Sequence, residues 1–209
     1  MAHASSLETK EQILDVAESE IAQHGYAGTT LRNVVSQAGV NLAAVHYHFG
    51  SKEDLFRAVI GRISQPIVST QLNDLDALLS RPDATPSVQE ILWAYLRSSF
   101  EVVLKDSQAH PMRGQFVRRC RTEPEPVQSI ASAQFAPSTE KFLDALQRAL
   151  PNQTRSQLTW KLDLVITSLI YTLAQAGKPN ALLMGDSPEE IETAVSKLIA
   201  FVLPGMESS

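Results

Sequence analysis

The feature that most constrains this chain is the spacing of its apolar residues, which recur every three or four positions along nearly its whole length. This spacing places apolar side chains on one face of an α-helix. No convincing run alternates between apolar and polar residues as a half-buried strand would. Helix-capping residues, glycines and prolines separate the periodic segments. The sequence therefore predicts an all-α fold of about nine helices.

Local signals set the expected helix boundaries. A capping box at residues 9–12 begins the first helix, and Gly25 ends it. The fifth helix is expected to take Thr85 as its cap and Pro86 as its first residue. The expected helices are residues 9–25, 30–38, 42–48, 52–80 with a kink at Pro66, 86–105, 112–121, 127–150, 154–176 and 187–203. Three short helices thus precede six that are mostly longer.

Composition and local sequence exclude several classes of protein. The single cysteine, Cys120, rules out a disulfide framework and a cysteine-based zinc site within one chain. The first residues have neither the basic nor the apolar region of a signal peptide. The longest apolar stretch, residues 158–176, contains Lys161 and Asp163 and is too interrupted to span a membrane. We expect a soluble, cytoplasmic protein of 209 residues without a metal or another cofactor.

The segment that points to function is residues 29–52, in which two short helices are joined by a turn containing Gly39. This arrangement is typical of a helix-turn-helix motif, whose second helix enters the DNA major groove. The helix beginning at Leu42 suits that role, because small outward residues at its start permit close approach to base edges. These small residues are Ala43 and Ala44, and the polar aromatic residues His46, Tyr47 and His48 follow them.

Residues 29–55, together with the preceding helix that ends in His24-Gly25-Tyr26, resemble the TetR family of transcriptional regulators. The resemblance covers about the first 60 residues and is specific, because it includes Ala38-Gly39-Val40, Tyr47-His48-Phe49 and residues 51–55. It implies a helix-turn-helix DNA-binding domain at residues 1–50 and an effector-binding and dimerisation domain at residues 51–209. It also implies a homodimeric repressor that a small-molecule effector releases from operator DNA.

The family's DNA contacts carry over to ten positions of this chain. At the second helix, Arg32 can pair with guanine, and Asn41 at the start of the recognition helix can hold a phosphate. Two departures from the family pattern bear on the operator sequence: His46 stands where many members have tyrosine, and Leu42 where many have a polar residue. The ten residues are Thr30, Arg32, Asn41, Leu42, Ala43, Ala44, His46, Tyr47, His48 and Lys52. Without the resemblance, Tyr47 and His48 could equally be core residues, and Arg32 a solvated charge.

Charge does not by itself favour DNA binding. The chain has a formal net charge of −5, and residues 1–62 carry five bases and seven acids, a net of −2. Bulk electrostatics therefore cannot drive association. We expect affinity to come from a few placed contacts and from two modules acting together on a symmetric site.

The last two long helices carry a dimer hypothesis. Residues 154–176 are apolar around too much of their circumference for a single buried face, and residues 187–203 have a second apolar stripe. Together they could form a four-helix interface with a second copy of the chain. Leu169 and Ile199 are candidates to face that partner. The alternative is an ordinary monomer core.

Aromatic residues and arginines between these regions form a candidate effector site. The apolar set could line a pocket for a small apolar or amphipathic molecule, and a run of arginines could bind an anionic head group such as that of a fatty acid. The alternatives are plain core for the aromatic residues and a solvated helix face for Arg118, Arg121 and their neighbours. Cys120 could be a redox sensor or a small buried residue. The candidates are Trp93, Phe100, Met112, Arg113, Phe116, Arg119, Phe135, Phe142, Trp160 and Tyr171.

Two rival classes remain open from the residues alone. An enzyme is disfavoured because the chain lacks a glycine-rich phosphate loop, a nucleophile elbow, a metal-spacing cluster and an evident Ser–His–Asp set. A helical protein–protein module would lack DNA binding altogether. The sequence favours a regulator that is not an enzyme.

Overall fold

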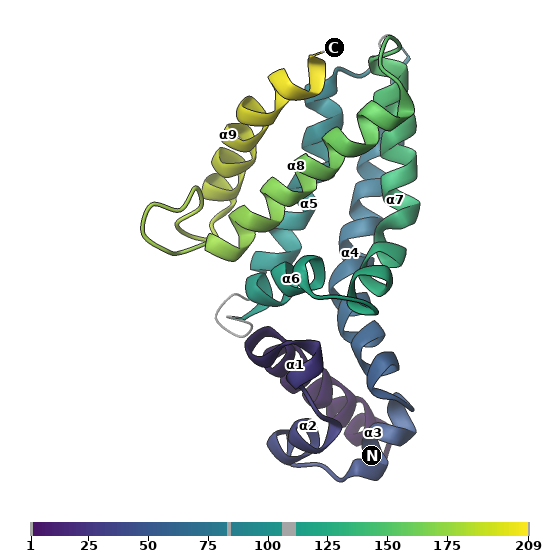
Figure 1. Cartoon of the computed structure of the whole chain (residues 1–209), viewed down its shortest axis with the longest axis vertical. Coiled ribbons are helices and arrows are strands. Elements are labelled where there is room, and N and C mark those ends of the chain that lie inside the picture. The colour runs from purple at the N-terminus through teal and green to yellow at the C-terminus, as the bar shows by residue number, and fades with distance from the viewer. Residues whose placement is uncertain (1, 83–84, 106–111, 209) are drawn as a thin grey trace. The chain divides into compact units, whose positions relative to one another are not determined.

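The computed structural model describes residues 2–82, 85–105 and 112–208, and these residues form nine α-helices without a strand (Figure 1). The all-α prediction is confirmed. The helices are α1 (Ala2–Gly28), α2 (Leu31–Ala38), α3 (Leu42–His48), α4 (Lys52–Leu79), α5 (Val88–Leu104), α6 (Arg113–Thr122), α7 (Val127–Ala149), α8 (Arg155–Gln175) and α9 (Pro188–Glu207).

The chain divides into two compact units. The first unit comprises residues 1–64 and 106–134, and the second comprises residues 65–105 and 135–209. Helix α6 therefore belongs with the N-terminal helices, whereas the division expected from the sequence, at residue 50, assigns it to the C-terminal domain. Helix α4 begins in the first unit and continues into the second.

The core of the first unit forms where α1 packs against α2, α3 and α6. Aromatic rings extend this core: the ring centroids of Tyr26 and Phe56 are 5.1 Å apart, and those of Phe56 and Phe116 are 6.1 Å apart. Apolar side chains from all of these helices and from α4 are removed from water, which is the main stabilising contribution. They include Ile13, Leu14, Ala17, Ile21, Val34, Ala38, Val45, Phe56 and Phe116.

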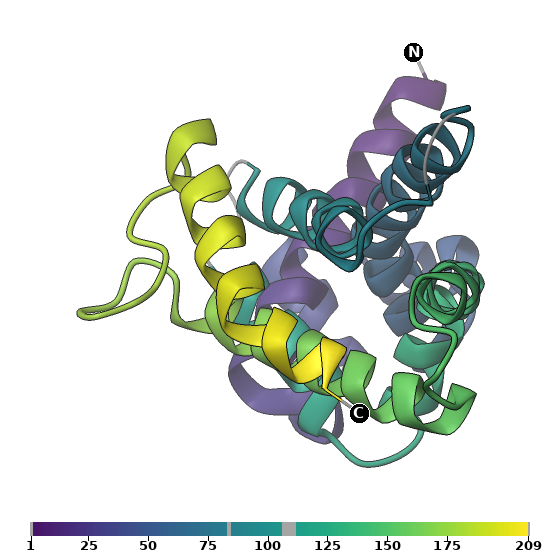
Figure 2. The same cartoon turned by 90° about the horizontal axis from the view of Figure 1, so that it is seen from above.

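The second unit is built around α5, which packs against both α8 and α9, while α8 and α9 also pack against each other (Figure 2). Most residues of α5 are buried, so this helix is apolar on more than one face. One polar connection crosses this core: the buried Gln71 amide donates to the Tyr95 carbonyl (2.7 Å) and accepts from the Ser138 hydroxyl (2.5 Å). Every polar group in that connection is hydrogen-bonded, as burial requires.

Helix ends agree with the sequence in some places and differ in others. Thr154 and Ser187 cap α8 and α9 as expected. The expected cap of α5 is wrong by two residues: Ser87 caps it, because its hydroxyl and Glu90 form a reciprocal capping box. Arg81, followed by Ser87, lowers the pKa of Glu90 to about 2. Helix α1 also starts before residue 9, at Ala2, and α9 continues beyond residue 203 to Glu207.

Candidate DNA-binding site

Helices α2 and α3 are held in a defined turn by their caps. The Thr30 hydroxyl accepts from the Asn33 N–H (3.1 Å), and the Asn41 Oδ1 accepts from the Ala44 N–H (2.8 Å). Gly39 closes α2 in the left-handed conformation (φ 64°), which a residue with a Cβ adopts only at a cost. These local bonds confirm the predicted helix, glycine turn and second helix.

The buried face of the motif is apolar. Val34 and Ala38 on α2 and Val45 on α3 are buried, and α2 and α3 both pack against α1. Because the buried residues fix which way each helix faces, the opposite side of each helix is directed outward, and its side chains are exposed. The motif therefore presents one face of α3 to solvent.

The predicted DNA contacts occupy that outward surface. Tyr47 is 82% exposed, which excludes the alternative that it is a core residue. Leu42 is also exposed, at 38%, although burial of a leucine side chain would stabilise the protein. The exposed candidates are Thr30, Arg32, Asn41, Leu42, Ala43, His46 and Tyr47, whereas Ala44, His48 and Lys52 are half-buried.

Two of the aromatic candidates have fixed surroundings. His46 Nδ1 lies 2.8 Å from the Gly50 carbonyl oxygen. Since a carbonyl oxygen only accepts hydrogen bonds, Nδ1 carries the proton and Nε2 is the ring atom left to meet a ligand. The His48 ring meets Tyr47 edge-on, with centroids 5.0 Å apart. The end of α3 thus holds a cluster of oriented polar rings.

Lys52 begins α4 beside the end of α1. Its ammonium nitrogen lies 4.3 Å from the centroid of the Tyr26 ring, within the range of a cation–π interaction. Burial lowers the pKa of Lys52, and the nearby carboxylate of Glu123 acts in the opposite direction. Burial, followed by the charge of Glu53, raises the pKa of Tyr26, so its ring remains a neutral phenol.

Three acidic residues of α1, Glu11, Asp15 and Glu18, are paired with arginines from other helices. Arg62 on α4 donates to Asp15 and to Glu18, each at 2.6 Å, and lies 3.3 Å from Glu11. Burial alone would lower the pKa of Arg62, but its hydrogen bonds to Glu18 and Asp15 raise it. Arg62 is already included in the net charge of −2 for residues 1–62, so Arg113 is the base from outside that segment that is paired with an acid of α1 here.

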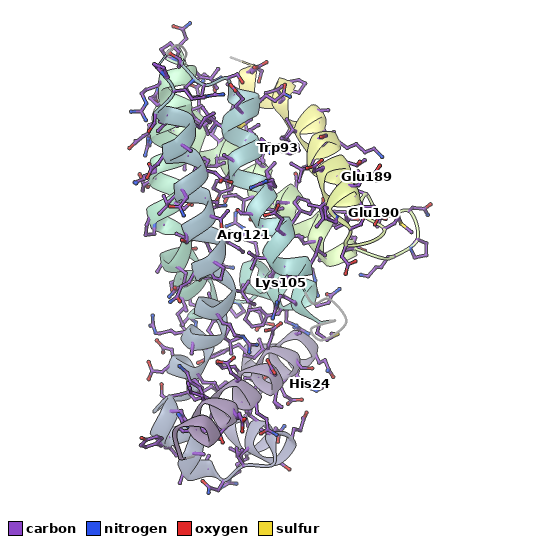
Figure 3. The ribbon with its side chains drawn as sticks, turned by 180° about the vertical axis from the view of Figure 1, so that it is seen from behind. His24, Trp93, Lys105, Arg121, Glu189 and Glu190 are labelled. Atoms are coloured by element: carbon purple, nitrogen blue, oxygen red, sulfur yellow. The ribbon has the colours of Figure 1, made fainter. Side chains whose placement is uncertain are left out.

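The arginine run of α6 contacts α1. Arg113 donates to Glu18, and Arg119 donates to the Ala22 carbonyl (2.9 Å), the Gln23 carbonyl (2.9 Å) and the Glu123 carboxylate (2.8 Å). Arg118 donates to Gln115 of its own helix, and Arg121 lies on the same helix (Figure 3). The donors of Arg113 and Arg119 are thus engaged with protein groups and not directed at an open pocket.

The aromatic effector candidates do not gather in one place. Met112 and Phe116 lie in the first unit with Arg113 and Arg119, and the other six belong to the second unit. In the second unit, Trp160 and Tyr171 lie on the surface of α8, 52% and 66% exposed. Phe100 and Phe142 are fully buried, while Trp93 and Phe135 are half-buried. Figure 3 labels Trp93 on α5.

A surface hollow in the second unit involves other residues. It lies where α4 ends and α5 begins, and none of its residues belongs to the expected effector set. It is lined by Leu79, Arg81, Pro82, Thr85, Pro86, Ala145 and Arg148.

Two contributors to the site escaped sequence reasoning. Tyr26 places its ring under Lys52, and Glu123 accepts from the Tyr26 backbone N–H (3.1 Å) although the two residues are 97 positions apart. The sequence around Gly25-Tyr26 carried a signal, since it formed part of the family resemblance. Nothing local to Glu123 indicated its partner.

An exposed, capped two-helix motif supported by a buried first helix defines a helix-turn-helix protein. The sequence matches two family models: "Bacterial regulatory proteins, tetR family" over residues 13–59, and "Tetracyclin repressor-like, C-terminal domain" over residues 93–205. The second match alone spans more than half of the chain. The protein belongs to the TetR family of bacterial transcriptional regulators.

Curated relatives resemble only part of the chain. The transcriptional repressor BepR of Brucella suis is 38% identical over 63 residues, which is 30% of each protein. The transcriptional dual regulator CecR of Shigella flexneri is 26% identical over 121 residues, 56% of this chain and 53% of the relative. The aligned part of this chain thus spans 30% of the first relative and 53% of the second.

Solved structures share the whole fold at low sequence identity. HlyIIR, a haemolysin II transcriptional regulator, is 17% identical with a TM-score of 0.59, and the match covers 98% of this chain and 99% of that one. A regulator from Pseudomonas aeruginosa PAO1 is 14% identical with a TM-score of 0.65, covering 95% and 89%. Within the part of the chain that the structure describes, no helix is long and apolar enough to cross a bilayer.

Proposed function

We propose that this protein is a homodimeric transcriptional repressor that binds a symmetric operator through α2 and α3. The observation that carries the proposal is the exposed face of α3, where Tyr47 and its neighbours lie outward over a buried Val45. Several relatives that match part of the chain are named repressors, including BepR and a probable acrEF/envCD operon repressor of Escherichia coli. We therefore assign the chain to gene regulation in the bacterial cytoplasm and not to catalysis.

Dimerisation through α8 and α9 is part of this proposal. Trp160, Leu164 and Tyr171 lie 4 and 7 residues apart along α8, on one face, and are 52%, 56% and 66% exposed. On α9, Phe201 is 78% exposed. Large apolar side chains gathered on a surface mark an interaction site. A second copy of the chain is the natural occupant, because a palindromic operator requires two recognition helices one DNA turn apart, about 34–36 Å.

The residues first considered for the dimer face have another role. Leu169 and Ile199 are only 5% and 3% exposed in a single protomer, so they support the core of the second unit. The interface we propose uses the same helices, residues 154–176 and 187–203, but the side chains on their exposed faces and not the buried Leu169 and Ile199.

Release by a small molecule is the remaining element of the proposal. The aromatic residues Trp93, Phe100, Phe135 and Phe142 of the second unit are the candidates we retain for an apolar effector. The preference for an anionic effector loses support, because Arg113 and Arg119 form hydrogen bonds with α1. An apolar ligand without a charged group is therefore the better first choice.

Operator selection from random DNA, followed by fluorescence anisotropy, tests the proposal. The expected result is a palindromic sequence bound by two protomers, with an affinity that falls steeply as salt rises. The DNA upstream of the gene that encodes this chain serves as a natural probe. Failure to enrich any sequence would overturn the repressor assignment and favour a helical protein–protein module. A thermal-shift screen of neutral, anionic and cationic apolar compounds would then rank effector classes.

A further inference from the structure

The C-terminal end of α6 holds the end of α1 through backbone groups. Arg119 donates to the Ala22 and Gln23 carbonyls, which lie just before Gly25, where the backbone of α1 departs from helical geometry. Glu123, paired with Arg119 at 2.8 Å, accepts from the Tyr26 N–H at 3.1 Å. One ion pair therefore satisfies both acceptors and a donor at the turn that leads from α1 into the helix-turn-helix motif.

Gly25 allows this ion pair to approach the backbone. Its φ of 75° and ψ of 168° lie in a region that only glycine occupies readily. A Cβ at this position would come within 2.4 Å of Glu123 Oε1 and 3.1 Å of Arg119 Nη1. The glycine thus does more than end a helix, since it provides the space in which Glu123 and Arg119 sit.

Tyr26 is fixed from a second direction as well. Its ring packs against Phe56 of α4, and Phe56 packs in turn against Phe116 of α6. Helix α6 therefore positions the Tyr26 backbone through Glu123 and its ring through Phe56. The ammonium of Lys52 lies on that ring, 4.3 Å from its centroid.

The geometry points to Glu123 as a positioning residue for DNA binding, which holds Tyr26 so that Lys52 is presented to the operator backbone. This inference rests on the proposed function, because it takes Lys52 as a phosphate contact. It assigns part of the DNA-binding apparatus to the C-cap residue of α6, which lies far along the sequence from the helix-turn-helix motif. Glu123 itself touches no DNA in this scheme.

The inference predicts a change in DNA affinity, on removal of the Glu123 charge, that is opposite in sign to the change expected from simple electrostatics. Removing a carboxylate beside a phosphate-binding lysine would strengthen DNA binding if charge alone mattered. If Glu123 acts by position, the isosteric Glu123→Gln change weakens binding. Glutamine keeps only one acceptor oxygen, so it cannot accept from both Arg119 and the Tyr26 N–H as the two carboxylate oxygens do. A positioning residue of this kind is expected to change affinity roughly 2- to 30-fold.

A double-mutant cycle with Lys52→Ala tests whether Glu123 acts on DNA binding through Tyr26 and Lys52. Operator Kd is measured by anisotropy at several salt concentrations for wild type, Glu123→Gln, Lys52→Ala and the double variant, each checked for folding by circular dichroism. We expect Glu123→Gln to weaken binding and to reduce the salt slope by up to one counterion in the wild-type background. In the Lys52→Ala background it should have almost no further effect.

The matched control is Glu125→Gln, which removes the same charge two residues away, where the carboxylate accepts only from groups of Ser129 in the contacts described. It should leave the operator Kd unchanged. Tyr26→Leu is the second variant: it removes the ring under Lys52 but keeps the backbone N–H that Glu123 accepts from. It should reproduce the loss seen with Glu123→Gln, and it keeps the inference testable if Glu123→Gln does not fold.

Three outcomes would overturn the inference. Tighter binding by Glu123→Gln would show that its charge, not its position, matters, and unchanged binding would show that Glu123 contributes by neither. An equal loss in the Lys52→Ala background would show that Glu123 acts on the motif as a whole. If Tyr26→Leu binds like wild type, the Tyr26 ring does not position Lys52 for DNA binding. Absence of sequence-specific binding by the wild-type protein would instead contradict the proposed function, and is therefore distinguishable.

Discussion

Arg113 of α6 binds Glu18 of α1 through two guanidinium nitrogens, with Nε 3.0 Å from Oε1 and Nη2 3.4 Å from Oε2. Arg62 of α4 donates to the same carboxylate at 2.6 Å, and the Glu18 side chain is only 4% exposed. One buried carboxylate thus joins three helices of the first unit. Charge burial of this kind is tolerated only while the partners remain in place.

Removing the carboxylate should therefore destabilise the protein more than removing one arginine. Glu18→Ala leaves both Arg62 and Arg113 without this partner, and we expect a loss of about 3–5 kcal/mol in the free energy of unfolding. Arg113→Ala should cost less, because Arg62 still pairs with Glu18. Urea unfolding followed by circular dichroism measures both.

A surface ion pair provides the comparison. Arg57 and Glu53 are paired at 2.6 Å, but both side chains are nearly half exposed. Arg57→Ala should therefore change stability by at most about 1 kcal/mol. If Glu18→Ala is no more destabilising than Arg57→Ala, the buried pair does not hold the three helices together.

The position of α6 shows where sequence reasoning fails. The basic residues of this helix were visible, but their partners, Glu18 and the carbonyls of Ala22 and Gln23, lie more than ninety residues earlier. Local patterning identifies a helix without identifying what it packs against. The anion-binding interpretation of Arg113 and Arg119 was reasonable for an isolated helix and loses support once α1 is present.

Short-range signals, by contrast, predicted the helix-turn-helix motif correctly. The caps Thr30 and Asn41 and the turn residue Gly39 act through bonds within three to five residues, so the sequence contains them completely. Pro86 led to the wrong cap because proline at a first helical position is only a tendency, and Ser87, the next residue, forms a capping box that competes with it. For Trp160 and Tyr171, residue type could not reveal which face of α8 is covered.

The proposed DNA contacts should fall into two energetic classes. Arg32→Ala should weaken operator binding by about 1–3 kcal/mol and relax specificity at a single base pair, because a base contact is lost. Lys52→Ala should weaken binding to all sequences alike and reduce the salt slope by about one. Anisotropy with a panel of single-base operator variants, repeated at several salt concentrations, separates the two.

Arg57→Ala is again the appropriate control, since it removes one positive charge from the exposed start of α4 but not a predicted contact. It should preserve base preference. Should Arg32→Ala and Lys52→Ala both bind as wild type while remaining folded, the assignment of these residues to the DNA surface is incorrect.

Dimerisation should depend on the exposed side chains of α8 and α9. Leu164→Glu or Phe201→Glu should yield a folded monomer, because each places an unpaired charge in the proposed interface without disturbing the protomer core. Leu169→Glu, at a buried position, should instead unfold the second unit. Sedimentation velocity and circular dichroism together distinguish dissociation from unfolding. A wild-type monomer at micromolar concentration would contradict the proposed interface.

Cys120 should be chemically inert in the folded protein. Burial, more than the nearby carboxylates of Glu123 and Glu18, raises the pKa of its thiol well above the ordinary value. The reactive thiolate is therefore scarcer at pH 7–8 than in an unfolded chain. The reaction with Ellman's reagent should be much slower in native protein than in urea. Equal rates in the two conditions would restore Cys120 as a candidate redox sensor.

The two glycines that bound the first helices allow a final comparison of conformational and steric effects. Gly39 has a φ of 64° and nothing within 4 Å of a Cβ, so Gly39→Ala should cost only the left-handed backbone term, roughly 1–2 kcal/mol. Gly25→Ala should cost more, because its φ of 75° and ψ of 168° are less accessible to alanine and its Cβ would meet Glu123. Urea unfolding measures the difference. The part of that difference due to contact should shrink in a Glu123→Ala background, which removes the colliding carboxylate while leaving the backbone conformation of residue 25 as demanding as before. A difference that stays the same in both backgrounds would mean that backbone strain alone, and not the close approach of Glu123, requires glycine at this position.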